Sequence, residues 1–95
     1  MSKSLYSDER VCWICHTPNN IHRHHIYGGA GRRPISEREG CWIYLCGPHH
    51  NLSNFGIHFD KELDKSFKED CERRWCKRND KTPDDFRQLF GINYI

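Results

Sequence analysis

The chain has 95 residues and a mass of 11.4 kDa, which corresponds to one domain, or to one domain with an appendage. Six cysteines and seven histidines stand beside only sixteen aliphatic side chains of Ala, Val, Ile, Leu and Met, so we expect a small core held by a metal or disulfide staple. The formal net charge is +2, and the excess of Lys and Arg lies in residues 1–58. This composition argues against a large pocket walled by this chain alone, and the longest apolar run, residues 41–46, is too short for a membrane span.

The first half of the chain predicts a two-stranded ribbon. Residues 1–9 are polar, lack the apolar core of a signal peptide and predict a flexible lead. A tight turn is expected over 12–15. β-Branched and aromatic residues predict a strand over 21–27, a glycine-rich basic loop follows over 28–34, and a second strand is predicted over 41–45. The two strands would pair as an antiparallel ribbon with a long connecting loop.

Three helices are expected after the ribbon. A short helix over 49–54 would end near Gly56, and Asp60 would cap a second helix. The apolar residues of that second helix recur every four positions and predict packing against the ribbon; they are Leu63, Phe67, Cys71 and Trp75. A polar linker over 77–81 would lead to a last helix that begins at Thr82-Pro83-Asp84-Asp85 and ends at Gly91. The sequence therefore predicts a small α+β fold, with a metal-bearing domain over 10–60 and C-terminal helices over 61–95 packed on it.

Two pairs of potential metal ligands share one spacing. Cys12 and Cys15 are separated by two residues, and so are Cys46 and His49. Each pair can bind one ion from a tight turn, and two pairs complete the tetrahedral shell that zinc prefers. In a reducing cytoplasm such spacings favour metal over disulfides. We therefore expect a structural zinc that fixes the start of the first strand against the end of the second. The alternatives are buried thiols beside an unrelated histidine, or a secreted peptide held by disulfides.

The remaining histidines suggest a second ion. Adjacent strand residues point to opposite faces, so His24 and His25 are expected to separate, one to bind metal and the other to act as a base. A short helix packed on the ribbon would bring His50 to the His24 side, and Gly56 would let the chain fold back to deliver His58. Three imidazoles leave coordination positions open for water and a phosphate oxygen.

The chain resembles the HNH endonucleases of the ββα-metal, or His-Me finger, fold over about residues 10–60. The stretches that carry the resemblance are Arg23-His24-His25-Ile26, the glycine-rich loop, Tyr44-Leu45-Cys46 and His49-His50-Asn51. The likeness is to small bacteriophage proteins of that superfamily that carry a zinc knuckle. The resemblance implies that a DNA phosphodiester bond is cut or nicked, inside the bacterial host cytoplasm, with Mg²⁺, Mn²⁺, Ni²⁺ or Zn²⁺.

The resemblance also implies a role for each histidine. His24, His50 and His58 would hold the divalent ion, and His25 would be the general base that activates water. Arg32 and Arg33 on the loop, together with Arg23, are candidate DNA contacts. The alternative for Arg32 and Arg33 is that they lie in a solvated loop that contacts nothing. DNA is the implied partner, and a second copy of the chain or another phage or host protein is a further candidate.

Two positions depart from the family pattern. Cys41 stands where the family usually has the asparagine that braces the long loop and the backbone of the base. His58 follows His50 by eight residues instead of the more usual four, and Asn54 occupies the four-residue position. The third ligand is therefore His58, Asn54 or water. These departures and the modest basic charge also fit a second hypothesis, a non-catalytic zinc-binding module that binds DNA or a protein partner.

Overall fold

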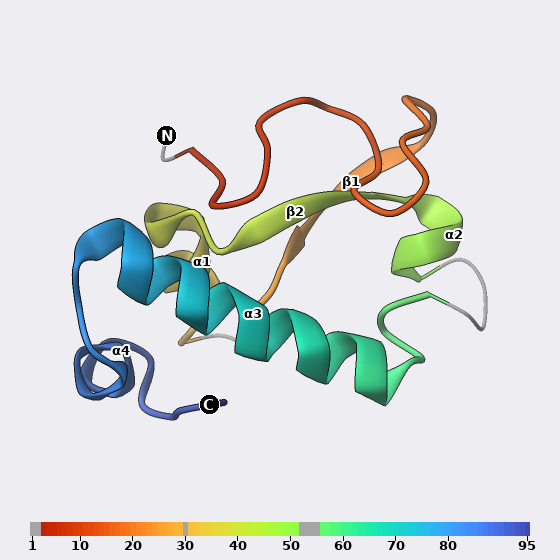
Figure 1. Ribbon diagram of the computed structural model, residues 1–95. Coiled ribbons are helices and arrows are strands. Elements are labelled where there is room, and N and C mark those ends of the chain that lie inside the picture. The colour runs from red at the N-terminus through yellow and green to blue at the C-terminus, as the bar shows by residue number, and fades with distance from the viewer. Residues whose placement is uncertain (1–2, 30, 52–55) are drawn as a thin grey trace.

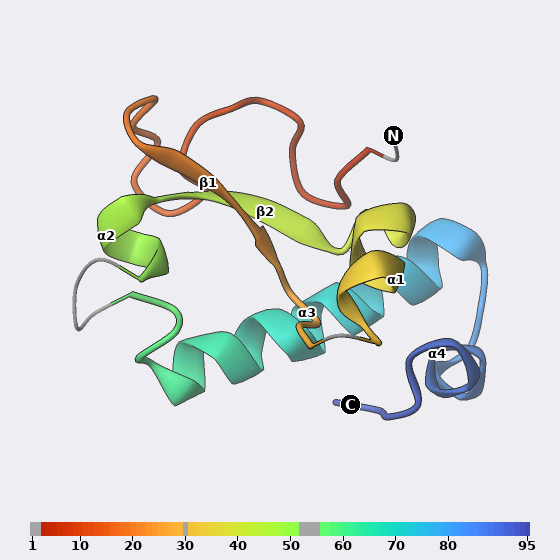
Figure 2. The ribbon, with the colours of Figure 1, turned by 180° about the vertical axis from the view of Figure 1, so that it is seen from behind.

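A computed structural model describes residues 3–29, 31–51 and 56–95 of the chain. Its elements in chain order are β1 (Ile21–His25), α1 (Arg33–Glu39), β2 (Trp42–Cys46), α2 (Gly47–His50), α3 (Lys61–Asn79) and α4 (Pro83–Phe90). The N-terminal segment runs along one side of the two strands and the long helix α3 along the other (Figures 1 and 2). The fold is thus a small α+β fold, in which a two-stranded hairpin is followed by a short helix and then by C-terminal helices.

The hairpin sorts the paired histidines onto different faces. β1 and β2 pair antiparallel, with His24 opposite Ile43 and His25 opposite Trp42. Directly opposed residues share a face of the sheet, and neighbouring residues alternate. His24 therefore lies on the face of Ile43, a core residue that packs with residues of α3, while His25 lies on the other face.

The core is small and rich in aromatic rings. Cys71 and Trp75 of α3 are buried, and Leu63 and Phe67 pack against the same cluster, as the four-residue spacing predicts. At the far end of the hairpin, Tyr27 is fully buried and the aromatic side chains of α4 pack on its ring. The ring centroid of Tyr27 lies 5.2 Å from that of Phe86 and 4.7 Å from that of Phe90.

The C-terminal helices begin where their capping residues predict. The Asp60 side chain accepts a hydrogen bond from the Leu63 amide, and Thr82 and Asp85 form a reciprocal capping box. The end of α3 differs from the prediction, because the helix continues through Asn79 instead of yielding to a linker at residue 77. Lys77 in its last turn favours this extension, because basic side chains stabilise the negative end of the helix dipole.

The main error of the sequence prediction lies between the strands. The interval expected to be a loop contains helix α1, which has Pro34 in its first turn and is ended by Gly40 in the left-handed region at φ 77°. Ser36 of α1 is fully buried, and its hydroxyl donates to the Tyr27 carbonyl at 2.8 Å and accepts from the Tyr27 amide at 3.2 Å. These bonds replace strand pairing at Tyr27, so β1 ends at His25 and not at 27.

The bounds of β2 and the start of α2 shift by one or two residues, and α2 is shorter than predicted. β2 spans 42–46 instead of 41–45, and α2 begins at Gly47, two residues before the predicted start. The predicted end, Asn54, lies outside the described residues, but the helix already ends at His50, because Asn51 at its C-cap leaves the helical region with φ −148°. Within the described ranges no helix is both long enough and apolar enough to cross a membrane.

Candidate metal centres

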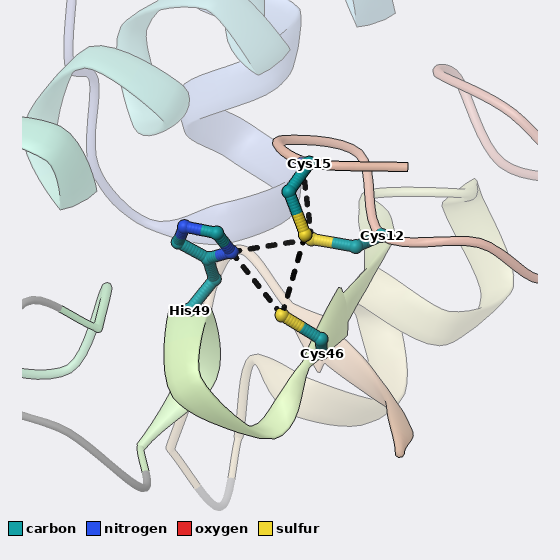
Figure 3. Close-up of side chains that lie close together, drawn as sticks. All are labelled: Cys12, Cys15, Cys46 and His49. Atoms are coloured by element: carbon teal, nitrogen blue, oxygen red, sulfur yellow. Dashed lines mark hydrogen bonds between the residues drawn. The ribbon is translucent and has the colours of Figure 1, made fainter. Parts of the chain in front are cut away.

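Four side chains from two distant parts of the chain converge beside the hairpin (Figure 3). Cys12 and Cys15 come from the N-terminal loop, Cys46 ends β2, and His49 lies in α2. Their ligand atoms all lie within 4.8 Å of one another. The Sγ atoms of Cys15 and Cys46 are 3.7 Å apart, and His49 Nδ1 lies 3.6 Å from Cys12 Sγ and 3.1 Å from Cys46 Sγ.

These separations fit zinc. Two thiolate sulfurs, each about 2.3 Å from a shared tetrahedral ion, lie roughly 3.8 Å apart, close to the distance between Cys15 and Cys46. Burial opposes ionisation of Cys12, but hydrogen bonds from the backbone of Cys15, Cys46 and Ile14 outweigh it and lower the pKa of this thiol to about 6. Burial and the two neighbouring thiols raise the pKa of Cys46 to about 11. A bound cation would deprotonate such a thiol, so this Cys3His group could hold a structural zinc.

Backbone hydrogen bonds join the two halves of this group. The Trp13 amide donates to the Tyr44 carbonyl at 2.8 Å, and the Gly47 amide donates to the Asn20 carbonyl at the same distance. The loop carrying Cys12 and Cys15 is therefore fixed to β2, and the residue before β1 is fixed to the start of α2. An ion here would hold the two chain ends of the hairpin together.

A second group is formed by three histidines, one of which, His50, follows His49 in α2. His24, His50 and His58 each offer a ring nitrogen, and these atoms also lie within 4.8 Å of one another. The His50 and His58 Nε2 atoms are 2.9 Å apart, and the His24 ring centroid is 5.2 Å from each of the other two centroids. The structure thus brings together the three histidines that the sequence analysis grouped.

The chain reaches this arrangement by folding back at Gly56. The Ile57 amide donates to the His49 carbonyl at 2.8 Å, and the His58 amide donates to the His50 carbonyl at 3.2 Å. A Cβ atom at Gly56 would stand 2.7 Å from the His50 carbonyl oxygen, so only glycine lets the two segments approach this closely. Asn54, the other candidate for the third ligand, lies outside the described residues.

Burial and the neighbouring histidines keep the imidazoles of His24 and His50 neutral near pH 7. Burial, and then the charges of His50 and His58, lower the pKa of His24 to about 3. Burial and its histidine neighbours likewise lower the pKa of His50 to about 4. The His24 side chain is only 5% exposed, and its Nε2 atom is buried without a hydrogen-bond partner among the described residues. A neutral imidazole with an unpaired buried nitrogen is suited to a cation, so the donor set fits a divalent metal.

His25 is held apart from the cluster by an acidic partner. Its Nε2 atom lies 3.0 Å from Oε1 of Glu37 in α1, and the other oxygen of that carboxylate accepts from Arg23 at 2.6 Å. Burial opposes ionisation of Glu37, but the hydrogen bonds from His25 and Arg23 outweigh it and lower its pKa. The carboxylate therefore accepts the Nε2 proton of His25, and in the neutral ring the lone pair then lies on Nδ1.

Two adjoining cavities connect His25 with the histidine cluster. One has a volume of about 250 Å³ and the other about 280 Å³, and both are lined by His24, His25, His58 and Gly28. The first also reaches Lys61, Asp64 and Lys68 of α3, and the second reaches Arg33. Helix α3 thus contributes two lysines and one aspartate to the lining of the first cavity.

The three arginines predicted to contact DNA differ in their surroundings. Arg33 is exposed at the rim of the second cavity. Arg32 donates through Nε to the Phe90 carbonyl at 3.0 Å and so ties α1 to α4. Arg23 lies with its guanidinium 3.8 Å from the centre of the Trp42 ring, in addition to its ion pair with Glu37.

Sequence reasoning missed the residues whose roles depend on α1 and α3. Glu37 and Ser36 lie in the helix that was expected to be a loop, and the lysines at the cavity lie on a helix assigned only to packing. Cys41 is fully buried, and its carbonyl accepts from the Ile26 amide at 2.9 Å. Bracing of the backbone beyond His25 therefore comes from the main chain of Cys41 and from the Ser36 hydroxyl.

Comparisons with models of protein families, with curated proteins and with solved structures gave no significant match to this chain.

Proposed function

We propose that the chain is a divalent-metal-dependent DNA endonuclease or nickase, with a ββα-metal type of site and a structural zinc knuckle. The observation that carries this proposal is the separation of two adjacent histidines. His24 joins a three-histidine cluster, while His25 on the opposite face is bonded to a carboxylate and lines the same cavities. Phosphodiester hydrolysis requires at least a site that can bind a divalent ion and a nearby group that can accept a proton. The histidine cluster would be the first and His25 the second.

In this proposal His25 takes the proton of the attacking water. The ionised Glu37 carboxylate accepts the Nε2 proton, fixing the ring and leaving Nδ1 as the basic atom. The same carboxylate would then stabilise the imidazolium that forms. Glu37 is itself held by Arg23 at 2.6 Å, so the base has a fixed orientation before substrate binds.

His24, His50 and His58 would hold the divalent ion. That ion would supply positive charge to the phosphate and to the leaving oxygen. Arg33 at one rim and Lys61 at the other would contact phosphates on either side of the scissile bond. Contacts of this kind position a strand but carry no sequence information, which agrees with a sequence-tolerant nuclease.

Relaxation of supercoiled plasmid tests the proposal. The zinc-loaded protein would be assayed with added Mg²⁺, Mn²⁺, Ni²⁺ or Zn²⁺, with chelator controls that are relieved by restoring the ion. We expect nicked or linear product with at least one ion, and loss of activity in His25→Ala. His16→Asn is the matched control, because it removes an exposed histidine outside both clusters and asparagine tolerates the left-handed φ of 65° at this position.

The same samples distinguish the alternative of a non-catalytic zinc module. One tightly bound zinc per chain, no second divalent ion and no cleavage with any added metal would support that alternative and refute the nuclease.

A further inference from the structure

His22 lies next to the histidine cluster without belonging to it. It stands two residues before His24 on β1, opposite Leu45, and therefore faces the same side of the hairpin. Its Nδ1 atom lies 3.0 Å from Nδ1 of His50. The other ring nitrogen of His50, Nε2, faces His58. Both ring nitrogens of His50 therefore have a histidine partner: His22 at Nδ1 and His58 at Nε2.

The protons along this contact can be assigned from one fixed point. The Asn20 side-chain oxygen lies 3.3 Å from Nε2 of His22, and an amide oxygen can only accept. His22 therefore donates its Nε2 proton to Asn20, and in the neutral ring its Nδ1 atom carries the lone pair. That atom must accept from Nδ1–H of His50. His50 is then left with its lone pair on Nε2, the atom that faces the cluster.

The main chain holds both ends of this series together. The Asn20 carbonyl accepts from the amide of Gly47, the first residue of the helix that carries His50. Asn20 itself has a left-handed backbone, with φ 53°, a conformation that asparagine tolerates better than most residues. Asn20, which accepts the first hydrogen bond, and His50, which donates the last, are therefore fixed to one corner of the fold.

We propose that Asn20 and His22 are positioning residues that hold His50 in the Nδ1–H tautomer, so that its Nε2 lone pair is directed at a divalent ion. The part that concerns the ion rests on the proposed function; the part that concerns the tautomer does not. A metal-bound histidine usually donates its second ring proton to a carboxylate, a carbonyl or water, and the partner orients the ligand. Here a second imidazole takes that place, itself oriented by an amide.

Nitrogen-15 spectra of histidine-labelled protein test the tautomer directly. The knuckle would be loaded with zinc and the second site left without added metal, at neutral pH. We expect the protonated nitrogen of His50 to be Nδ1 in the wild type. In His22→Phe, which keeps a planar ring but removes both nitrogens, His50 should move toward the Nε2–H form that histidine prefers in water. A wild-type His50 that carries its proton on Nε2 would overturn the proposal.

Binding of Mn²⁺, followed by the electron paramagnetic resonance of the free ion, tests the consequence. Loss of such an orienting partner typically weakens metal binding by about 10–100-fold, and we expect His22→Phe to fall in this range. Asn20→Gly keeps the left-handed backbone but removes the acceptor, so it should weaken binding in the same direction, whereas Asn20→Asp retains an acceptor and should bind as tightly as the wild type. Zinc content and thermal unfolding establish that each variant is folded.

The two measurements separate two kinds of failure. A wild-type His50 with the Nδ1–H tautomer in a protein that binds no second ion would refute the proposed function and the metal part of this inference, while the hydrogen-bond series would stand. Normal Mn²⁺ binding by His22→Phe, in a folded protein, would refute the positioning role and leave the proposed function intact.

Discussion

The return of the chain onto α2 can be tested by adding one methyl group. In Gly56→Ala the new Cβ atom would stand 2.7 Å from the carbonyl oxygen of His50 and 3.0 Å from that of Pro48, whereas ordinary contact begins near 3.4 Å. All of the nearest atoms belong to the backbone, so no side chain can swing away. The segment carrying His58 must therefore retreat from α2 by roughly 0.7 Å, at an overpacking cost of about 1–3 kcal/mol.

This displacement should reach the metal ligands. The Nε2 atoms of His50 and His58 are 2.9 Å apart, and metal–ligand distances tolerate only about 0.2 Å of change. We therefore expect Gly56→Ala to weaken Mn²⁺ binding about tenfold or more and to lower the Tm by several degrees, measured by paramagnetic resonance and by thermal unfolding of the zinc-loaded protein. Gly31→Ala is the matched control, since nothing lies within 4 Å of its added methyl group. Wild-type affinity and Tm in Gly56→Ala would refute the close approach of the two segments.

Three further predictions concern stability. Cys46→Ser should abolish stoichiometric zinc binding and cooperative thermal unfolding. The reason is that structural zinc contributes about 10–16 kcal/mol to folding, whereas the free energy of unfolding of a protein is only about 5–15 kcal/mol. Cys76→Ser, which lies outside the Cys3His group, should retain both properties. Ser36→Ala leaves both buried backbone groups of Tyr27 without their partner and should cost about 2–3 kcal/mol in denaturant unfolding; an unchanged midpoint would contradict this. Since the pKa of His24 is about 3 in the folded protein and 6.5 when unperturbed, the unfolded chain binds more protons between these values and stability falls as the pH falls through them. The stability difference between the wild type and His24→Leu should therefore change with pH over this window, and a constant difference would refute the neutral buried state.

Local patterns in the sequence predict much of this fold because they act over short distances. Capping residues predicted the starts of both C-terminal helices, and the two-residue separation within each ligand pair predicted the Cys3His group. Strand alternation alone placed His24 and His25 on different faces. Each of these inferences depends on neighbours only a few residues apart.

The features that escaped prediction depend on contacts between distant segments. Helix α1 has only seven residues, carries no acidic residue in its first turn and follows a glycine-rich stretch, so its propensity is weak. Its buried Ser36 and its ion pair through Glu37 stabilise it only after β1 is in place. The role of His22 was missed for the same reason, since its partner His50 is 28 residues away and Asn20 had no recognisable motif.

The cleavage rate of His25→Ala, measured together with its metal content, tests the central claim of two sites with different tasks most directly. Single-turnover relaxation of plasmid would be compared between the wild type and the variant, with zinc and Mn²⁺ counted in the same samples. We predict that the variant keeps both ions and cleaves about 10²–10⁴-fold more slowly, the usual contribution of a general base. Equal rates in two fully loaded proteins would contradict the assignment of His25 as the base and, with it, the division of labour between the two adjacent histidines.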